Sequence, residues 1–388
     1  MSCVQIPDLP TDQFRAETIQ KWLDNRVPLS GSMELDLRCN LRCLHCYRDG
    51  EWPPGILNTQ EVCGILDQIA QAGTIFLLFT GGEILLRRDF FEIYSHAKKL
   101  GLLLTLFTNG TMVTESIADR LAANPPRGIE ITLYGDSTET YEKVTGVPGS
   151  RDKCYRGVDL LLKRGLPVVL KTVVLSSNRH EFMDMFHFAE ERGAHFRWDT
   201  QINPNFNGSL TPCNVRLSPE EVVELEFSVP ARVEEYRRLF EPRKDLRTSR
   251  IFACGAGSRT FNIDPYGNMK MCVLLRDPEF SLRKMSFAQI WNEMFPPVYN
   301  RFRDAQHQCN SCNLVSLCGK CAAWSLMEKG DMAARVEYSC EIGHRRAQKL
   351  GYWDGPIDQY SSDRTEVLLP IFKGPHPEVR PLSGGCCG

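Results

Sequence analysis

The sequence predicts an α/β fold with a parallel sheet, followed by a smaller cysteine-rich domain, and three observations support this prediction. Strand-like and helix-like segments alternate between residues 32 and 200. Several strand candidates are uninterrupted apolar runs, as expected of parallel strands that are covered on both faces. Seven cysteines then lie close together in residues 254–340, where the alternation has ended.

Six segments are predicted as strands: residues 32–37, 75–79, 102–107, 129–133, 168–175 and 196–200. Helices are predicted between them over residues 59–72, 89–100, 114–123, 151–164 and 180–192. Four of these helices are each followed by a glycine, as is common just after a helix end: Gly73, Gly101, Gly165 and Gly193. Consecutive βα units indicate a parallel sheet that is either doubly wound or curved into a partial barrel.

The composition is that of a soluble globular protein, with 388 residues of which 42% are hydrophobic and 24% charged. The formal net charge is −2, which argues against a broad nucleic-acid or acidic-membrane footprint. No apolar run approaches the roughly 20 residues of a membrane span, and the N-terminus lacks the apolar core of a signal peptide. We therefore expect a cytoplasmic protein whose sixteen cysteines serve metal binding rather than disulfides.

Three cysteines follow the first predicted strand with the spacing C-x3-C-x2-C: Cys39, Cys43 and Cys46. Thiols this close on one loop can converge on one metal centre. A cubane cluster has four irons, so three cysteines would leave one iron open to a small molecule, whereas electron-carrying clusters usually have four cysteine ligands. A zinc site with His45 as the fourth ligand is the alternative.

Two further polar stretches end neighbouring strands at the same edge of the sheet, where ligands bind in such folds. Thr80-Gly-Gly-Glu83 follows the second strand, and Thr108-Asn-Gly110 follows the third. Glycines there allow the backbone to approach a ligand closely. The sequence thus predicts one site on this rim, beside the cysteine loop.

This combination of motifs resembles the radical S-adenosylmethionine (SAM) enzymes. The resemblance implies a partial (β/α)6 TIM-like barrel and a [4Fe-4S] cluster on Cys39, Cys43 and Cys46. The open iron would chelate SAM, and one electron would cleave SAM reductively to a 5′-deoxyadenosyl radical that abstracts hydrogen from a substrate. The residues at the positions implied to contact SAM are Tyr47, Thr80, Gly81, Gly82, Glu83, Asn109 and Thr132.

The fourth strand departs from the family pattern. Thr132-Leu-Tyr-Gly135 stands where many members carry Ser-Leu-Asp-Gly, so that Thr132 keeps the hydroxyl and Tyr134 replaces the aspartate. We therefore do not assign the family's substrate contacts to residues of this strand. Lys171, Arg197 and Asp199, near the ends of later strands, are either substrate contacts or ordinary salt-bridge residues of the barrel.

The second cysteine block reads Cys254-x12-Gly267-x4-Cys272, then Cys309-x2-Cys312-x5-Cys318-x2-Cys321, then Cys340. A turn over residues 263–268 predicts a hairpin in front of Cys272. The block resembles the SPASM extension of radical SAM enzymes, apart from one residue missing between Cys318 and Cys321. Two auxiliary [4Fe-4S] clusters are implied, an outer one on Cys309, Cys312, Cys318 and Cys340 and an inner one on Cys254, Cys272 and Cys321. A zinc ribbon is the alternative.

The inner set has no evident fourth thiolate. The fourth iron of the inner cluster would either lack a protein ligand or be bound by a distant residue, for which Cys386 and Cys387 are candidates. The other cysteines have no partner spacing: Cys63 and Cys154 are expected in helix cores, Cys213 near the site, and Cys3 is unassigned.

The expected organisation is an N-terminal extension (1–31), the radical SAM partial barrel (32–215), a helical linker (216–250), the SPASM domain (251–345) and an extended C-terminal arm (346–388). Auxiliary clusters that accept electrons suit an oxidative modification of a peptide or protein, such as a cross-link or thioether. The alternatives are oxidation or decarboxylation of a small molecule such as a tetrapyrrole and, remotely, a non-catalytic zinc protein. The expected partners are the substrate, an electron donor such as flavodoxin or ferredoxin, and a separate leader-peptide-binding protein, because 31 residues are too few for a leader-binding domain.

Overall fold

The computed structural model describes residues 18, 20–22, 24–48, 54–240 and 247–357. All six predicted strands are present and pair in parallel in chain order. They are β1 (Ser30–Asp36), β2 (Phe76–Gly81), β3 (Leu103–Thr108), β4 (Gly128–Thr132), β5 (Val168–Val173) and β6 (His195–Asp199). The predicted helix over residues 12–25 lies mostly outside the described residues.

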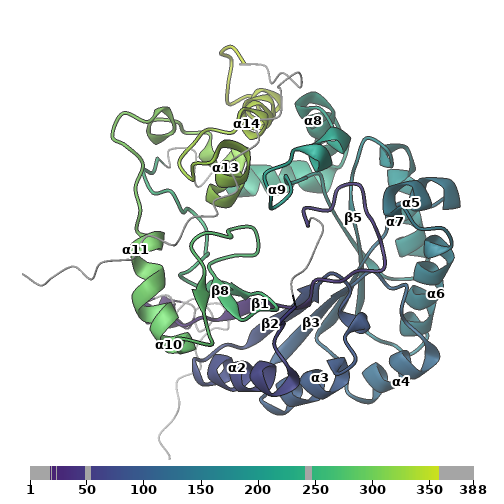
Figure 1. Cartoon of the computed structure of the whole chain (residues 1–388). Coiled ribbons are helices and arrows are strands. Elements are labelled where there is room, and N and C mark those ends of the chain that lie inside the picture. Colours follow the sequence, from purple (N-terminus) through teal and green to yellow (C-terminus); the bar gives the residue numbers. More distant parts are fainter. Residues whose placement is uncertain (1–17, 19, 23, 49–53, 241–246, 358–388) are drawn as a thin grey trace, which may run out of the picture.

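Helices cover the outer face of a curved sheet, so the sheet is a partial barrel and the doubly wound alternative is wrong (Figure 1). These are α2 (Thr59–Gln71), α3 (Phe90–Lys99), α4 (Glu115–Ala123), α5 (Thr138–Thr145), α6 (Ser150–Leu162) and α7 (Phe182–Glu191). The sequence did not predict α5. It begins at a Ser137 cap, whose side chain accepts a hydrogen bond from the Thr140 amide.

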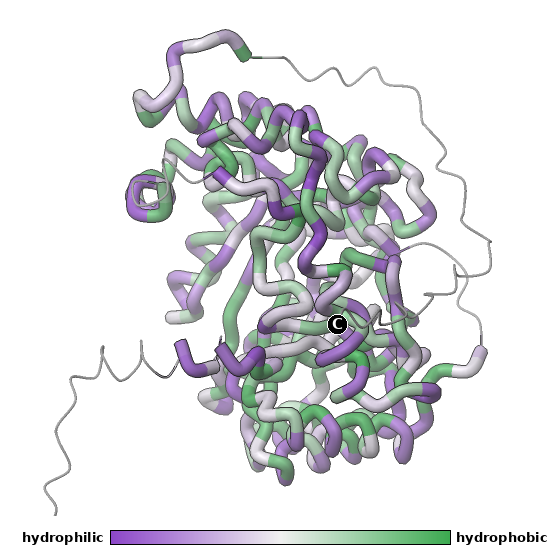
Figure 2. Tube along the Cα trace, turned by 90° about the vertical axis from the view of Figure 1, so that its left-hand side faces the viewer, coloured by the Kyte–Doolittle hydropathy of each residue, from purple (hydrophilic) through white to green (hydrophobic). Residues whose placement is uncertain are grey.

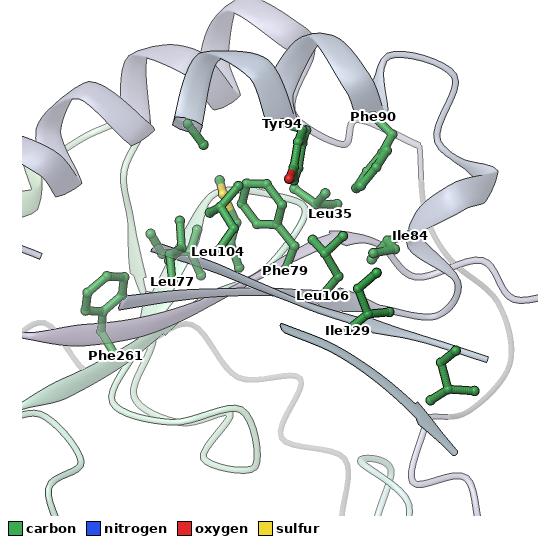
Figure 3. Packing of buried hydrophobic residues seen from close by; sticks show 14 of the residues in the cluster. Leu35, Leu77, Phe79, Ile84, Phe90, Tyr94, Leu104, Leu106, Ile129 and Phe261 are labelled. Atoms are coloured by element: carbon green, nitrogen blue, oxygen red, sulfur yellow. The ribbon is translucent and has the colours of Figure 1, made fainter. Parts of the chain in front are cut away.

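The main core lies between the strands and these helices (Figure 3). Phe79 and Leu106 alternate along their strands with less buried positions, and together with Leu35 they pack toward Phe90 and Tyr94 of α3. Because strand side chains alternate between faces, the intervening residues line the inner face of the barrel. The inner face is therefore where a substrate can enter.

The cysteine-rich part continues the barrel sheet instead of forming a separate sheet. β7 (Thr260–Ile263) pairs in parallel with β1, and β8 (Asn268–Lys270) and β9 (Phe280–Ser281) follow in antiparallel order. The predicted hairpin over residues 263–268 is thus confirmed. Its union with the barrel in one nine-stranded sheet was not predicted.

Most helices of the second half of the chain face the open side of the barrel, whereas the short helices within residues 287–299 lie at its outer side, where α10 contacts α2 (Figure 1). They are α8 (Pro219–Phe227), α9 (Pro230–Phe240), α10 (Phe287–Gln289), α11 (Phe295–Tyr299), α12 (Val315–Cys318), α13 (Ala322–Lys329) and α14 (Glu337–Leu350), with a π-helical turn over Ile290–Met294. Hydrophilic and hydrophobic stretches alternate along the helices, as expected of helices with one buried face (Figure 2). The boundary expected at residue 345 falls inside α14, which ends at Leu350.

Short 3₁₀ turns complete the fold at Ile84–Leu86, Arg179–Glu181, Thr211–Val215 and Gln308–Asn310. No helix in the described ranges is both long and apolar enough to cross a bilayer.

Candidate functional site

The three cysteines of the first motif lie together on the loop that leaves the carboxyl end of β1. Backbone bonds hold this loop against α5, because Arg42 N donates to Thr145 O (2.8 Å) and Leu44 N donates to Val144 O (3.0 Å). The thiols are near enough for each to disfavour ionisation of its neighbours. Burial is the larger effect and raises the pKa of the Cys43 thiol to about 12.

This donor set suits a cationic iron–sulfur group. The raised pKa values of Cys39 and Cys43 favour the protonated thiols when nothing is bound, and a cluster would stabilise the thiolate forms and release protons on binding. His45 is buried with its Nδ1 unpartnered, and burial lowers its pKa to about 4. Within the described residues, no three thiol, imidazole or carboxylate groups converge on a point that one metal ion could occupy.

Gly81 and Gly82 are needed because the backbone of the cysteine loop passes directly over them. A Cβ on Gly81 would lie 2.2 Å from Asp36 O, and one on Gly82 would lie 2.1 Å from Arg38 O. Gly82 N donates to Asp36 O (2.7 Å), which fastens the two loops together. The glycines thus set the distance between the rim and the cysteines, a role additional to any contact with a ligand.

Glu83 has its carboxylate turned into the protein. It is fully buried and accepts hydrogen bonds from Thr108 Oγ1 (2.8 and 2.9 Å), Asn109 N (2.8 Å) and Leu85 N (3.1 Å). Burial raises its pKa, although these donors oppose that effect. With both oxygens occupied, the Glu83 side chain positions the ends of β2 and β3 and presents no free atom to a ligand.

Asn109 connects the end of β3 to the cysteine loop. Its Nδ2 donates to Asn40 Oδ1 (2.9 Å) and lies 3.8 Å from Cys39 Sγ, and its Oδ1 accepts from the Thr111 amide (2.9 Å). The expected rim residue is therefore in direct contact with the first motif.

Tyr47 lies on the other side of the cysteines in a buried polar cluster. Its ring packs edge-on against Phe206 at 5.0 Å between centroids. Next to it, Arg48 forms a buried ion pair with Glu34 of β1. Arg276, after the β7–β8 hairpin, approaches the same carboxylate at 3.6 Å. This cluster joins the cysteine loop to the second cysteine block, and no motif in the sequence indicated it.

Tyr134, which replaces the aspartate of the family pattern, lies against the cysteine loop. Its ring centroid is 5.3 Å from that of His45, and its hydroxyl lies near enough to the Cys43 sulfur to affect the pKa of that thiol. Thr132, two residues earlier, lies on the inner face in register with Lys171 of β5. The replacement of the family's aspartate by Tyr134 thus places a phenol ring next to the cysteine loop.

The outer cysteine set lies around one small cavity. Cys309, Cys312, Cys318 and Cys340 all line it, together with Lys320 and His344. Burial raises the pKa of Cys318 to about 12, and the other three thiols add to that effect. Lys320 Nζ lies 3.8 Å from Cys309 Sγ and donates to the carbonyls of Ala333 and Ala334 at 2.8 Å.

The inner set is also brought together. Burial raises the pKa of Cys272 to about 11, with contributions from Cys321 and Cys254, so these three thiols are neighbours. Cys386 and Cys387 lie outside the described residues, as does Cys3.

The cysteines without partner spacing lie apart from these three sets. Cys154 is buried in the α6 core, whereas Cys63 of α2 is only partly buried. Cys213 lies in the turn after β6, near Arg216 and Glu328 rather than any cysteine set.

Comparisons with known proteins agree with this geometry. The Radical SAM superfamily matches residues 34–189, and SPASM, an iron–sulfur cluster-binding domain, matches residues 254–322. An AdoMet-dependent heme synthase of Methanosarcina barkeri is 25% identical over 330 residues, 79% of this chain and 94% of that protein. Mycofactocin maturase MftC of Mycobacterium tuberculosis is 26% identical over 391 residues, 95% and 97% of the two chains.

PqqA peptide cyclase of Granulibacter bethesdensis is 27% identical over 324 residues, 79% of this chain and 85% of that one. Among solved structures, Streptococcus suis SuiB bound to precursor peptide SuiA shares the fold, with a TM-score of 0.66 at 15% identity over 88% of this chain and 84% of that one. A radical SAM domain binds a [4Fe-4S] cluster and SAM, and a SPASM domain binds auxiliary iron–sulfur clusters. The chain therefore belongs to the radical SAM enzymes that carry a SPASM domain.

Proposed function

We propose that this enzyme oxidatively modifies a peptide or protein substrate. Cys39, Cys43 and Cys46 would hold the [4Fe-4S] cluster that binds SAM. Cys309, Cys312, Cys318 and Cys340 would hold an outer auxiliary cluster, and Cys254, Cys272 and Cys321 an inner one. When bound, the first cluster and SAM supply a radical that removes hydrogen from a substrate carbon, and the auxiliary clusters accept an electron.

The protein's own residues prepare the site for that chemistry. Asn109 and Tyr134 contact the sulfurs of Cys39 and Cys43 and hold the loop in place. Thr80 and Thr132 present hydroxyls on the inner face of β2 and β4, on the same rim as the cysteines. Gly81 and Gly82 let the second rim loop pack directly on the first, which leaves little room for water between them.

The observation that carries the peptide assignment is a groove along β6. In the described part of the chain β6 pairs with β5 alone, so no strand occupies its outer edge, where Trp198 O accepts a hydrogen bond from Arg232 Nη2 (3.2 Å). The groove beside this edge is lined by β6, by Arg232 and Tyr236 of α9, and by Tyr338 of α14, and it reaches Cys318. An extended peptide can add to such an edge by backbone pairing. The likeness to mycofactocin maturase and to PqqA peptide cyclase supports the same substrate class.

The test is a reaction with the short peptides encoded near this gene. Anaerobically reconstituted enzyme, SAM and a flavodoxin or dithionite reductant are expected to release 5′-deoxyadenosine and a peptide that has lost two hydrogens, measured by mass spectrometry. Cys43→Ala should abolish both products, whereas Cys63→Ala, a matched change in α2, should leave both intact. Release of 5′-deoxyadenosine with every candidate peptide unchanged would contradict the proposal.

Oxidative decarboxylation of a tetrapyrrole is the second candidate, and the likeness to AdoMet-dependent heme synthase favours it. The same assay with an iron tetrapyrrole that bears propionate side chains separates the two, because only this reaction releases carbon dioxide. A product from the tetrapyrrole and none from any peptide would replace the first proposal by the second.

A further inference from the structure

Three charged residues lie side by side on the inner face of the barrel. Lys171 of β5 and Arg197 of β6 are in register, and Glu130 of β4 lies one step further from the rim. Each alternates along its strand with residues that face the helices, such as Ile129, Ile131 and Leu170, which are fully buried. The three charged side chains therefore point into the space that a substrate would occupy.

The two cations share a single carboxylate. Lys171 Nζ is 3.3 Å from Glu130 Oε2, and Arg197 Nη1 is 3.3 Å from Glu130 Oε1. Below the ammonium lies an aromatic face, since Lys171 Nζ is 3.0 Å from the ring centroid of Phe107. One carboxylate thus balances two positive charges, and most N–H donors of the two side chains have no acceptor among these contacts.

Asp199 does not supply the missing negative charge. It follows Arg197 by two residues, and its Oδ1 accepts a hydrogen bond from the Gln201 amide at 2.7 Å, which fixes it at the strand end. His195, two residues before Arg197, is exposed at the other end of β6. The group formed by Glu130, Lys171 and Arg197 therefore has one more positive charge than negative charge.

A purely structural role explains this arrangement poorly. The side chain of Lys171 is only 22% exposed and that of Glu130 only 15%, so both ions have lost much of their hydration. Partly buried ion pairs seldom contribute more stability than apolar residues of similar size. Arg197, by contrast, is 61% exposed and free to bend toward a ligand.

We propose that Lys171 and Arg197 bind a carboxylate of the peptide substrate inside the barrel. Resting on the proposed function, this inference narrows the substrate to a peptide that presents a carboxylate close to the reacting carbon. The position of Lys171 agrees with this proposal, which needs the carboxylate to lie close to the SAM site. Lys171 is in register with Thr132, one of the residues implied to contact SAM, and adjacent strands are about 4.8 Å apart. The incoming carboxylate would complete the charge balance, and the Arg197 fork would give it a two-point contact.

The experiment measures ligand protection of the Lys171 amine and needs no turnover. Holoenzyme is treated with a limiting amount of an amine-acylating reagent, and modification at Lys171 is followed by peptide mass spectrometry. N-acetylglycine is the probe for a C-terminal carboxylate, and N-acetylglutamic acid α-amide is the probe for a side-chain carboxylate. Each acid is compared with a control in which the carboxylate is replaced by an uncharged amide. At saturation we expect one of the two acids to slow acylation of Lys171 by about tenfold, and its amide to have no effect.

Variants and competing outcomes make the result decisive. Arg197→Gln should remove the protection, whereas Arg192→Gln, which breaks an ion pair with Asp159 on the outer helices, should retain it. Equal acylation with acid and amide would overturn the inference. Protection by a porphyrin propionate but by neither amino-acid probe would overturn the peptide assignment. Because the readout is binding, a failed peptide reaction with intact protection would refute the proposed function alone.

Discussion

At the scale of single residues, contacts to the cysteine sulfurs govern how easily a bound cluster is reduced. Hydrogen bonds to cluster sulfurs raise the reduction potential, because they stabilise the added negative charge. The Tyr134 hydroxyl lies near enough to the Cys43 sulfur to affect its pKa, and we expect it to donate such a hydrogen bond when a cluster is bound. Tyr134→Phe should therefore lower the potential of the first cluster by on the order of 50 mV, measured by a redox titration followed by EPR.

Tyr141→Phe is the matched control for that change. It removes a hydroxyl from the neighbouring ring, 5.6 Å from Tyr134 between centroids, and leaves the contact to Cys43 in place. An unchanged potential in Tyr134→Phe, or the same shift in both variants, would show that the hydroxyl does not act on the cluster.

The Lys171 ammonium provides a second prediction, on pH. Burial lowers its pKa to about 8 from an ordinary value of 10.5, against the opposing effect of Glu130. Between these two values the unfolded chain holds the proton and the folded chain releases it, so stability from this residue rises with pH across that window. The free energy of unfolding of wild type relative to Lys171→Met should thus increase from pH 8 to pH 10 in urea titrations. A constant difference would contradict the shift.

The sequence predicted the residues of the site better than their roles. Thiol spacing identified the three cysteine sets because the spacing itself brings the sulfurs together. For Glu83 the motif gave the position but not the orientation, which depends on Thr108 and Asn109 from another strand. The pairing of Glu34 with Arg48 and Arg276 was missed, because Arg276 lies more than 200 positions from Glu34 and no local pattern encodes either contact.

At the scale of elements, apolar runs predicted the six barrel strands, and helical periodicity predicted five of the helices that cover them. The short helix α5 was missed, since its eight residues carry only four buried positions. The segment around Trp291 forms a π-helical turn, in which Trp291 packs against Phe287 and Phe295. Tertiary packing of this kind cannot be read from local propensity.

The packing of α14 on α12 gives a prediction at this scale. Gly343 of α14 lies so close to α12 that a Cβ would be 2.6 Å from Cys318 Cβ and 2.8 Å from Cys318 Cα. Gly343→Ala should push Cys318 away from Cys340 and the other outer thiols. We expect iron content to fall by about four atoms per chain, from about twelve, with the first cluster's EPR signal retained.

Gly64→Ala serves as the control for Gly343→Ala. Gly64 also lies within a helix, α2, but nothing lies within 4 Å of a Cβ there, so iron content should stay unchanged. A full complement of iron in Gly343→Ala would mean that the outer cluster tolerates movement of Cys318, or that Cys318 is not a ligand.

At the scale of the whole molecule, the barrel and the SPASM hairpin form one sheet. A boundary at residue 250 was predicted because the second cysteine block begins at Cys254, and it separates β1 from its neighbour β7. The contact between these strands is close, because Gly31 pairs with Phe261 and the ring of Phe261 lies over it. That ring also packs against Phe287 at 4.9 Å, so a single side chain connects the barrel to the C-terminal helices.

This junction predicts that the two parts unfold together. A Cβ on Gly31 would lie 2.2 Å from the Phe261 ring, so Gly31→Ala should destabilise the apo-protein by about 2 kcal/mol. Phe261→Ala should cost about 4 kcal/mol, since it empties a buried site. In the double variant the clash is gone, and its total cost should be about 2 kcal/mol below the sum of the two.

Urea unfolding followed by both circular dichroism and tryptophan fluorescence tests this coupling. Circular dichroism reports mainly on the strands and helices of the barrel. In a background with Trp22, Trp52 and Trp198 changed to Phe, the remaining tryptophans, Trp291, Trp324 and Trp353, report on the C-terminal half. If the shared sheet makes the molecule one cooperative unit, both signals should shift to the same lower midpoint in each single variant. Two separate transitions, of which only the fluorescence transition moves, would mean that the SPASM domain unfolds alone and that the β1–β7 pairing does not couple it to the barrel.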